Sequence, residues 1–145
     1  MSPSAEELIK KYRVNNQFGK LLGMEFKILS PGHVEYFLEV KEEFLATPHS
    51  AHGGLISAFM DGLLGVCGLS AVAEEGKVVS TIEFKINFFN PVFVKDQLRG
   101  EAKIEHKGSR ILILGGIITV QNRENILVSK AMGTFNSYPA SKAGY

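Results

Sequence analysis

The sequence predicts an α+β fold in which an antiparallel sheet of five to six strands wraps around one long central helix. Two patterns carry this prediction. The segment 53–76 is apolar on every side of a helix, which is typical of a helix buried on all sides. Most segments after it alternate in polarity with a period of two, as half-buried strands do. The sheet must cover the only apolar helix, so residues 1–145 are predicted to form a single domain.

The elements before the central helix are marked by local signals. Ser4 followed by Glu7 has the pattern of a capping box, so a helix is expected over residues 4–19. Two strands are expected at 23–29 and 34–40, joined by a turn at residues 30–32. A loop then leads into the central helix, which Gly76 is expected to end.

Four strands are expected after the helix. Strand 81–88 places Thr81 on the polar face, and its apolar face carries Ile82, Phe84, Ile86 and Phe88. Strand 98–107 has charged residues on one face. Strand 111–120 is apolar on both faces, so it is expected at the centre of the sheet, and strand 126–136 follows it after a turn.

Composition restricts the class of protein. Lys and Arg number 16 against 15 Asp and Glu, without a basic cluster, so no nucleic-acid partner is expected. The single cysteine, Cys67, excludes an internal disulfide, and with no signal-peptide core the expected location is cytoplasmic. Residues 55–73 could span a bilayer by length, but Asp61 and several glycines interrupt the stretch, so no membrane partner is expected.

Asp61 is the single charge in this apolar helix. At helical spacing it shares one stripe with four small residues, Gly54, Ala58, Gly65 and Gly68. Small side chains let another surface come close, so Asp61 would face a narrow gap. Two interpretations remain open: the stripe only allows tight packing while Asp61 binds a backbone amide, or Asp61 performs chemistry.

The residues at the start of the helix favour the interpretation in which Asp61 takes part in catalysis. Gly53 and Gly54 place unhindered N–H groups at a helix N-terminus, where they could form an oxyanion hole. His52, directly before them, could orient a loop or a substrate. Gly53 and Asp61 are eight residues apart, or about 12 Å along the helix axis. One helix therefore cannot bring both to a single carbonyl carbon. A site shared between two subunits would bring both groups to one carbonyl carbon, and such a site would require an obligate dimer.

These residues resemble a known family, the hotdog-fold acyl-CoA thioesterases of the PaaI-like (phenylacetate-degradation) branch. The resemblance covers nearly the whole chain and rests on His52-Gly53-Gly54, Asp61 nine residues after the histidine, and the segments 89–92, 108–110 and 131–135. It implies a homodimer or homotetramer that hydrolyses an acyl-CoA to free acid and CoA. Asp61 would be the nucleophile or general base, and the Gly53 amide would polarise the thioester carbonyl. His52 would support the loop, and Thr81 would help to place the attacking water.

The resemblance leaves several points open. The turn Lys107, Gly108, Ser109 and Arg110 is a candidate for binding CoA phosphates, or only a solvated turn. CoA would enter as part of the substrate, so no cofactor is expected, and no metal is expected because His49 and His52 lack a third ligand. Many relatives carry an asparagine where this chain has Ala46. The alternatives are a non-catalytic acyl-CoA binder or sensor, a hotdog dehydratase and a purely structural dimer module.

Overall fold

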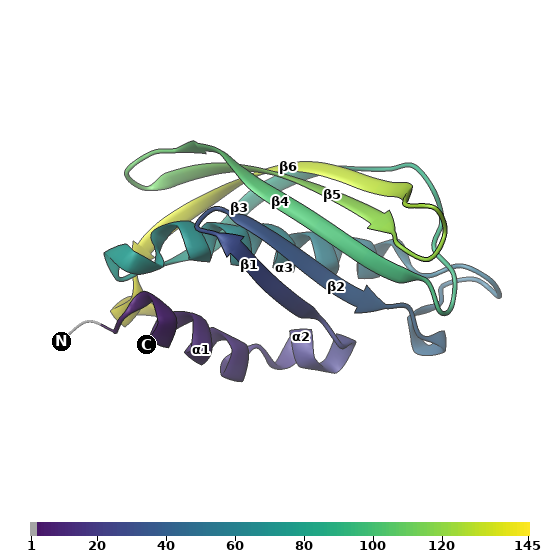
Figure 1. The fold of residues 1–145 in the computed structure, drawn as a ribbon, viewed down its shortest axis with the longest axis horizontal. Helices are drawn as coiled ribbons and strands as arrows, with labels where there is room; N and C mark the ends of the chain where they lie inside the picture. The colour runs from purple at the N-terminus through teal and green to yellow at the C-terminus, as the bar shows by residue number, and fades with distance from the viewer. Residues whose placement is uncertain (1–2) are drawn as a thin grey trace.

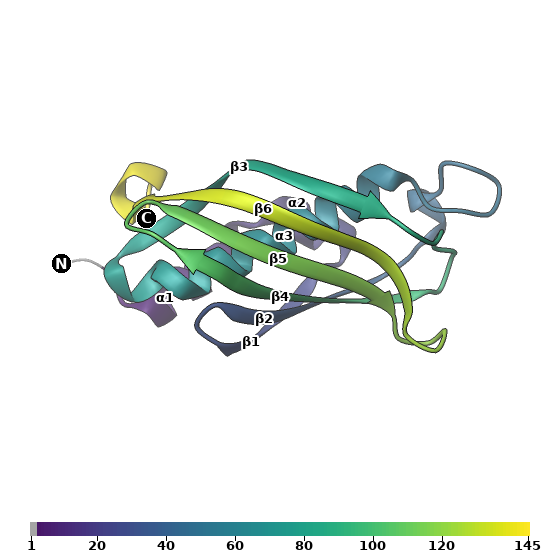
Figure 2. The ribbon, with the colours of Figure 1, turned by 90° about the horizontal axis from the view of Figure 1, so that it is seen from above.

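The computed structural model describes residues 3–145 and has one antiparallel six-stranded sheet wrapped around a long helix (Figures 1 and 2). The predicted fold class is confirmed. The strands lie side by side in the order β1-β2-β4-β5-β6-β3. The elements are α1 (Ala5–Asn15), α2 (Gln17–Leu22), β1 (Glu25–Ser30), β2 (His33–Glu39), α3 (Gly53–Val72), β3 (Lys77–Phe88), β4 (Gln97–Lys107), β5 (Ile111–Val120) and β6 (Ile126–Pro139), with short 3-10 turns at Glu42–Phe44, Ala73–Glu75 and Ala140–Ala143.

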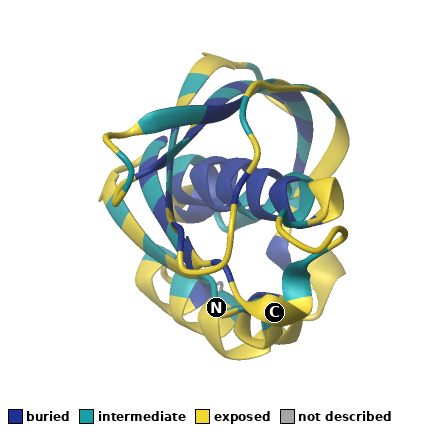
Figure 3. Cartoon of the chain, turned by 90° about the vertical axis from the view of Figure 1, so that its right-hand side faces the viewer, coloured by how far each residue is buried: buried dark blue, intermediate teal, exposed yellow. Residues whose placement is uncertain are grey.

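The core of the protein is the interface between α3 and the concave face of the sheet, which Figure 3 shows as a buried helix inside a ring of strands. Two strand glycines make room for large helix side chains: a Cβ at Gly100 would lie 2.7 Å from the Phe59 ring, and one at Gly116 would lie 2.7 Å from the Met60 sulfur. The segment Gly53–Glu75 is long and apolar enough to cross a membrane, but 67% of its most apolar window is buried in the fold. It is the core helix of a globular domain.

The N-terminal segment forms two helices where the sequence predicts one over residues 4–19. The capping box is present, because the Ser4 hydroxyl accepts from the Glu7 N–H and the Glu7 carboxylate accepts from the Ser4 N–H. Asn16 interrupts the helix because its side chain accepts a hydrogen bond from the Gly19 N–H and thereby caps α2. In Figure 1 both helices lie below α3, on the side that the sheet leaves open.

Strand β3 contains a β-bulge that overturns one prediction. The register shifts between Thr81, which pairs with Phe135, and Glu83, which pairs with Thr134. Phe135 is buried, so Thr81 faces α3 and does not lie on the polar face of the strand. The extra residue at the bulge, Ile82, reverses the alternation at this point, which a strict period of two cannot anticipate.

Candidate active site

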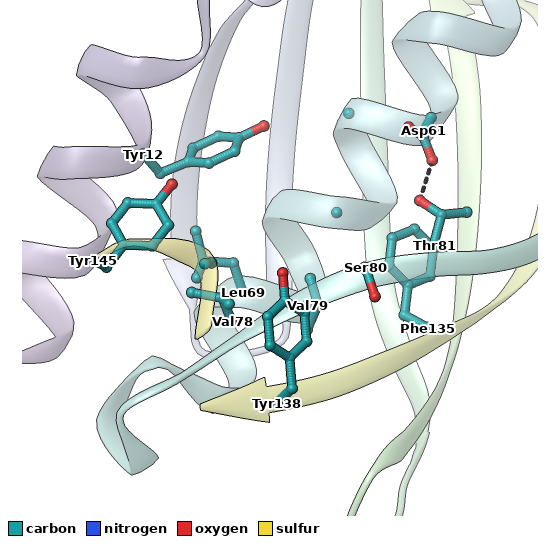
Figure 4. Close-up of a pocket in the computed structure, with 13 residues that line it drawn as sticks. Tyr12, Asp61, Leu69, Val78, Val79, Ser80, Thr81, Phe135, Tyr138 and Tyr145 are labelled. Carbon is teal, nitrogen blue, oxygen red and sulfur yellow. Dashed lines mark hydrogen bonds between the residues drawn. The ribbon is translucent and has the colours of Figure 1, made fainter. Parts of the chain in front are cut away.

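Asp61 and Thr81 meet where α3 packs against β3 (Figure 4). The Thr81 hydroxyl donates a hydrogen bond of 2.6 Å to Oδ1 of Asp61. Asp61 is half-buried, and within residues 3–145 its side chain makes no other hydrogen bond. It therefore does not bind a backbone amide there, as the packing interpretation of the stripe required. One carboxylate oxygen is held by a hydroxyl, and the other is left for a ligand or for water.

A pocket of about 340 Å³ opens beside Asp61. It extends from Asp61 toward the C-terminal end of α3, past Gly62 and Gly65. At Gly65 a Cβ would meet only the Phe135 ring, at 3.8 Å, so the helix surface is open at this point. Apolar side chains and tyrosines line it together with Ser80 and Thr81; the lining includes Leu69, Val78, Val79, Phe135, Tyr12, Tyr138 and Tyr145. Such a combination suits an apolar group of limited length.

Tyr12 is a pocket residue that the sequence did not single out. Its hydroxyl accepts a hydrogen bond of 3.2 Å from the Asn16 amide. Burial raises the pKa of Tyr12, and a hydrogen bond from the Tyr36 hydroxyl acts in the opposite direction. The Tyr36 hydroxyl packs against α3 next to Asp61, because a Cβ at Gly62 would lie 2.8 Å from its oxygen. The packing of α1 brings Tyr12 into the pocket that Asp61 also lines, whereas Tyr36 comes from β2.

The N-terminus of α3 shows why a histidine precedes two glycines. His52 is the N-cap, and its Nδ1 accepts a hydrogen bond of 2.7 Å from the Gly54 N–H. A Cβ at Gly54 would lie 2.8 Å from that nitrogen, so glycine is needed there. At Gly53 a Cβ would meet only the Phe88 ring, at 3.9 Å, so the fold of this chain does not require glycine. Of the two N–H groups predicted for an oxyanion hole, that of Gly54 already donates to His52 and is not available to a ligand.

The Gly53 amide is the one that remains available. Within the described part of the chain its N–H has no hydrogen-bond acceptor, and the residue is exposed. A second pocket, of about 230 Å³, lies at this end of the helix. Its lining consists of Ala51, Gly53, Ile56, Phe88, Phe89, Asn90, Pro91 and Val92. Gly53 and Asp61 therefore lie in different pockets of one chain, at opposite ends of the first half of α3.

The candidate CoA turn lies at the other end of α3. The Lys107 ammonium donates to the Ala71 carbonyl at 2.9 Å and also pairs with Glu75. Hydrogen bonds from Lys107 and Lys77 lower the pKa of Glu75 to about 2. Lys107 thus caps the C-terminal end of the helix. Arg110 is exposed, and within residues 3–145 its side chain makes a single hydrogen bond, of 3.5 Å, to Asn136, so it is the freer cation of the turn.

Two further residues, Ala46 and Cys67, have no side-chain group available for catalysis. Ala46 lies in an exposed loop, where its N–H donates to the Ser50 carbonyl at 3.0 Å and its side chain offers no polar group. Cys67 is buried, its thiol contacts the Gly32 carbonyl at 3.3 Å, and burial raises its pKa to about 12. Such a thiol is a core residue and not a nucleophile.

Comparison with known proteins places this geometry in a family. Residues 49–126, more than half of the chain, match the thioesterase superfamily, whereas no curated protein matches. The Escherichia coli PaaI protein of the phenylacetic acid degradation operon is 21% identical with a TM-score of 0.81, over 92% of this chain and 93% of that one. A thioesterase family protein from Silicibacter pomeroyi is 20% identical with a TM-score of 0.83, over 94% and 99%. A hypothetical thioesterase from Streptococcus pneumoniae, solved with coenzyme A, is 23% identical with a TM-score of 0.75, over 90% and 97%. The chain belongs to the thioesterase superfamily and has the hotdog fold.

Proposed function

We propose that this protein hydrolyses an acyl-CoA thioester to the free acid and CoA, with Asp61 as the reacting carboxylate. The observation that carries the proposal is the carboxylate itself, which a single hydroxyl holds in a pocket lined by apolar side chains and tyrosines. Membership of the thioesterase superfamily supports the reaction type. Coenzyme A bound to the Streptococcus pneumoniae protein of the same fold supports CoA as the thiol. Cytoplasmic location fits a chain whose one cysteine is an unpaired thiol.

The chemistry requires two groups. Asp61 either removes a proton from a water that attacks the thioester carbon, or attacks that carbon itself to give a mixed anhydride that water then hydrolyses. In both routes negative charge develops on the carbonyl oxygen, where the Gly53 N–H would stabilise it. The carbon–sulfur bond then breaks, and CoA leaves as a thiolate, which needs no strong general acid. Thr81 orients the carboxylate in either route.

The two groups must come from different chains. They are about 12 Å apart along one helix, whereas a reacting carbon needs both within about 3 Å. The edge of β3 can join two chains, because β3 is the longer of the two edge strands, with 12 residues against 6 in β1. A long, uncovered edge strand invites pairing with another strand. We therefore infer a homodimer in which β3 of one chain pairs with β3 of the other in antiparallel orientation.

The geometry of β3 supports this pairing. Thr81, bonded to Asp61, and Phe88, next to Gly53, are seven residues apart, or about 24 Å along the strand. A two-fold axis near the middle of this segment would place the Phe88 end of each strand beside the Thr81 end of its partner. The Gly53 amide of one chain would then approach Asp61 of the other, which creates two composite sites per dimer.

Charge selects the register. With the axis at Phe84, Glu83 of each strand faces Lys85 of the other, and both lie on the convex face, where Glu83 accepts from Thr134. An axis at Lys85 would instead oppose two lysines. We propose the register centred on Phe84. The exposed apolar residues Ile82, Phe88 and Phe89 would be covered at the same time.

The test is a thiol-release assay with short, medium, long and aryl acyl-CoAs on the purified protein, with Asp61→Ala and Asp61→Asn alongside. We expect turnover by the natural protein and its loss, by at least a hundredfold, in both variants. A matched control is Glu74→Gln, which removes an exposed carboxylate at the far end of α3. The dimer mass of each variant, measured by light scattering, separates loss of chemistry from loss of assembly.

The same measurements also distinguish an enzyme from a non-catalytic acyl-CoA binder. Full turnover by Asp61→Ala would remove Asp61 from the mechanism. Tight binding of acyl-CoA by the natural protein, with no turnover on any member of the panel, would instead identify a non-catalytic acyl-CoA binder. Ala46 favours that alternative, since its side chain supplies no amide to hold a thioester or a water near the start of α3.

A further inference from the structure

We propose that the pocket beside Asp61 binds a straight, uncharged acyl chain of about eight to ten carbons, and that Gly65 and Tyr145 determine this specificity. Gly65 lets the chain pass along the helix, and Tyr145 stops it at the far end of the pocket. The proposal rests on the proposed function above and deepens it, because it names the acyl group that the site would release as a free acid.

The pocket is a groove between one face of α3 and the first part of β3 (Figure 4). Its helix side carries Asp61, Gly65 and Leu69, which are four residues apart and share one face of the helix. Its strand side runs from Thr81 back to Val78. Eight residues of a helix cover about 12 Å along its axis, and three residues of a strand cover about 10 Å. Both sides therefore give a groove of about 10 to 12 Å beyond the carboxylate.

This length sets the number of carbons. An extended carbon chain advances roughly 1.3 Å per atom, because its bonds are about 1.5 Å long and the chain bends at each carbon. A groove of about 10 to 12 Å thus holds about eight or nine carbons beyond the thioester carbonyl. A chain of fourteen carbons would need roughly 17 Å and would not fit. A phenylacetyl group would fill about half of the groove and leave its far end without a ligand.

Gly65 is the narrow point of the groove. A Cβ built on Gly65 would lie 3.8 Å from the Phe135 ring, which is ordinary van der Waals contact. The gap between helix and sheet at this position is therefore one carbon wide. A straight chain of methylenes fits such a gap, whereas a branched chain or a substituted ring needs more room. A side chain at position 65 would fill the gap and shorten the groove to one turn of helix, about 6 Å.

Three tyrosines close the far end of the groove. Tyr12 comes from α1, Tyr138 from the end of β6 and Tyr145 from the turn after it. Figure 4 shows their rings at the end of the pocket away from the carboxylate, and all three pack against the small apolar cluster that contains Leu69. Tyr12 is also hydrogen-bonded to Asn16, and Tyr138 lies within the paired part of β6. Tyr145 is therefore the member whose removal disturbs the fold least.

The charges around the groove select an uncharged chain. Of the residues in the described chain that line the pocket, Asp61 is the only charged one. Burial raises the pKa of both Tyr12 and Tyr145, so these two phenols are neutral at physiological pH. A carboxylate at the far end of an acyl chain would lie among apolar side chains without a cation, which opposes its desolvation. A terminal methyl group gains from the same burial.

The test measures kcat/KM by thiol release on straight acyl-CoAs of four, eight and fourteen carbons, on phenylacetyl-CoA and on the eight-carbon dicarboxylic acyl-CoA. For the natural protein we expect kcat/KM to rise about fourfold with each methylene up to about ten carbons, because each added methylene is buried. At fourteen carbons kcat/KM should be at least tenfold lower than at eight. Phenylacetyl-CoA and the dicarboxylic substrate should also be at least tenfold poorer than octanoyl-CoA.

Two variants test the two residues separately. Gly65→Val should lower the ratio of kcat/KM for eight carbons to that for four carbons at least tenfold, because four carbons end before position 65. Tyr145→Ala should raise the ratio for fourteen carbons to eight carbons at least tenfold. Leu29→Ala is the matched control, because Leu29 is an apolar residue, 41% exposed, on the other edge strand, β1. It should keep the chain-length profile of the natural protein.

The outcomes separate this proposal from the proposed function. Faster turnover of phenylacetyl-CoA than of every straight chain, or equal turnover at eight and fourteen carbons, would overturn the specificity and leave the enzyme intact. An unchanged ratio in either variant would also overturn it; Gly65→Ala replaces Gly65→Val if the latter fails to fold by circular dichroism.

If no acyl-CoA is hydrolysed, the proposed function fails and the groove is tested by binding alone. Calorimetry with S-butyl-, S-octyl- and S-tetradecyl-CoA then measures the same dependence on chain length. Tightest binding of the octyl compound would support the groove, and equal affinities for the three would refute it.

Discussion

The hydrogen bond between Thr81 and Asp61 gives a sharp prediction, because Thr81→Val removes one oxygen and keeps the shape of the side chain. The bond is 2.6 Å long and its acceptor is a carboxylate. Hydrogen bonds to charged groups contribute about 1.5 to 3 kcal/mol. Thr81 is exposed in the single chain, so the lower end applies. A loss of about 1.4 kcal/mol in transition-state stabilisation corresponds to a tenfold decrease in rate. We expect Thr81→Val to lower kcat/KM about tenfold.

The assay is thiol release on the best acyl-CoA of the panel, with the dimer mass recorded for each variant. Thr81→Ser keeps a hydroxyl and should restore most of the activity. Thr134→Val is the matched control, because the Thr134 hydroxyl also donates to a carboxylate, Glu83, at 2.6 Å, but on the convex face. It should leave kcat/KM unchanged. Equal activity of Thr81→Val and the natural protein would refute the idea that this hydroxyl holds the reacting carboxylate.

Two further predictions concern stability. Asp96 is 4% exposed and forms a two-point ion pair with Arg123, with bonds of 2.8 and 2.7 Å. We expect Asp96→Ala to lower the free energy of unfolding by about 2 to 3 kcal/mol. The change should be seen as a lower urea midpoint with an unchanged m-value. An unchanged midpoint would show that this pair does not stabilise the fold. Gly54→Ala should lower the unfolding free energy by about 1 kcal/mol through displacement of the His52 cap. Gly53→Ala, where a Cβ meets nothing closer than 3.9 Å, should be neutral or stabilising, and urea unfolding of the two glycine variants measures both effects.

Most of the architecture could be predicted because it follows from local patterns. The all-apolar segment became α3, and its predicted stop at Gly76 is a glycine in the left-handed region, with φ of 66°. The strand apolar on both faces became β5, between β4 and β6. The predicted helix over 4–19 was interrupted because Asn16 caps the following turn, a local competition that apolar spacing does not report.

The candidate site was predictable only in part. Asp61, Gly53 and His52 could be chosen from their spacing, since they belong to one helix and its cap. The orientation of Thr81 could not be predicted, because the bulge that turns it toward α3 depends on the register with β6. Tyr12 gave no signal, because its hydroxyl reaches the pocket only when α1 packs across the open side of the sheet.

Two conclusions could be reached from the sequence without a structure: one apolar helix must be enclosed by a sheet, and a carboxylate and an N-terminal amide of that helix lie too far apart to act together. Those properties depend on periodicity and on the rise of a helix, which neighbouring residues fix. The folded chain was needed to show which hydroxyl holds Asp61, which phenols line its pocket and which strands lie at the two edges of the sheet. Each of these depends on contacts between residues distant in the chain, and such contacts exist only once the sheet has closed around α3.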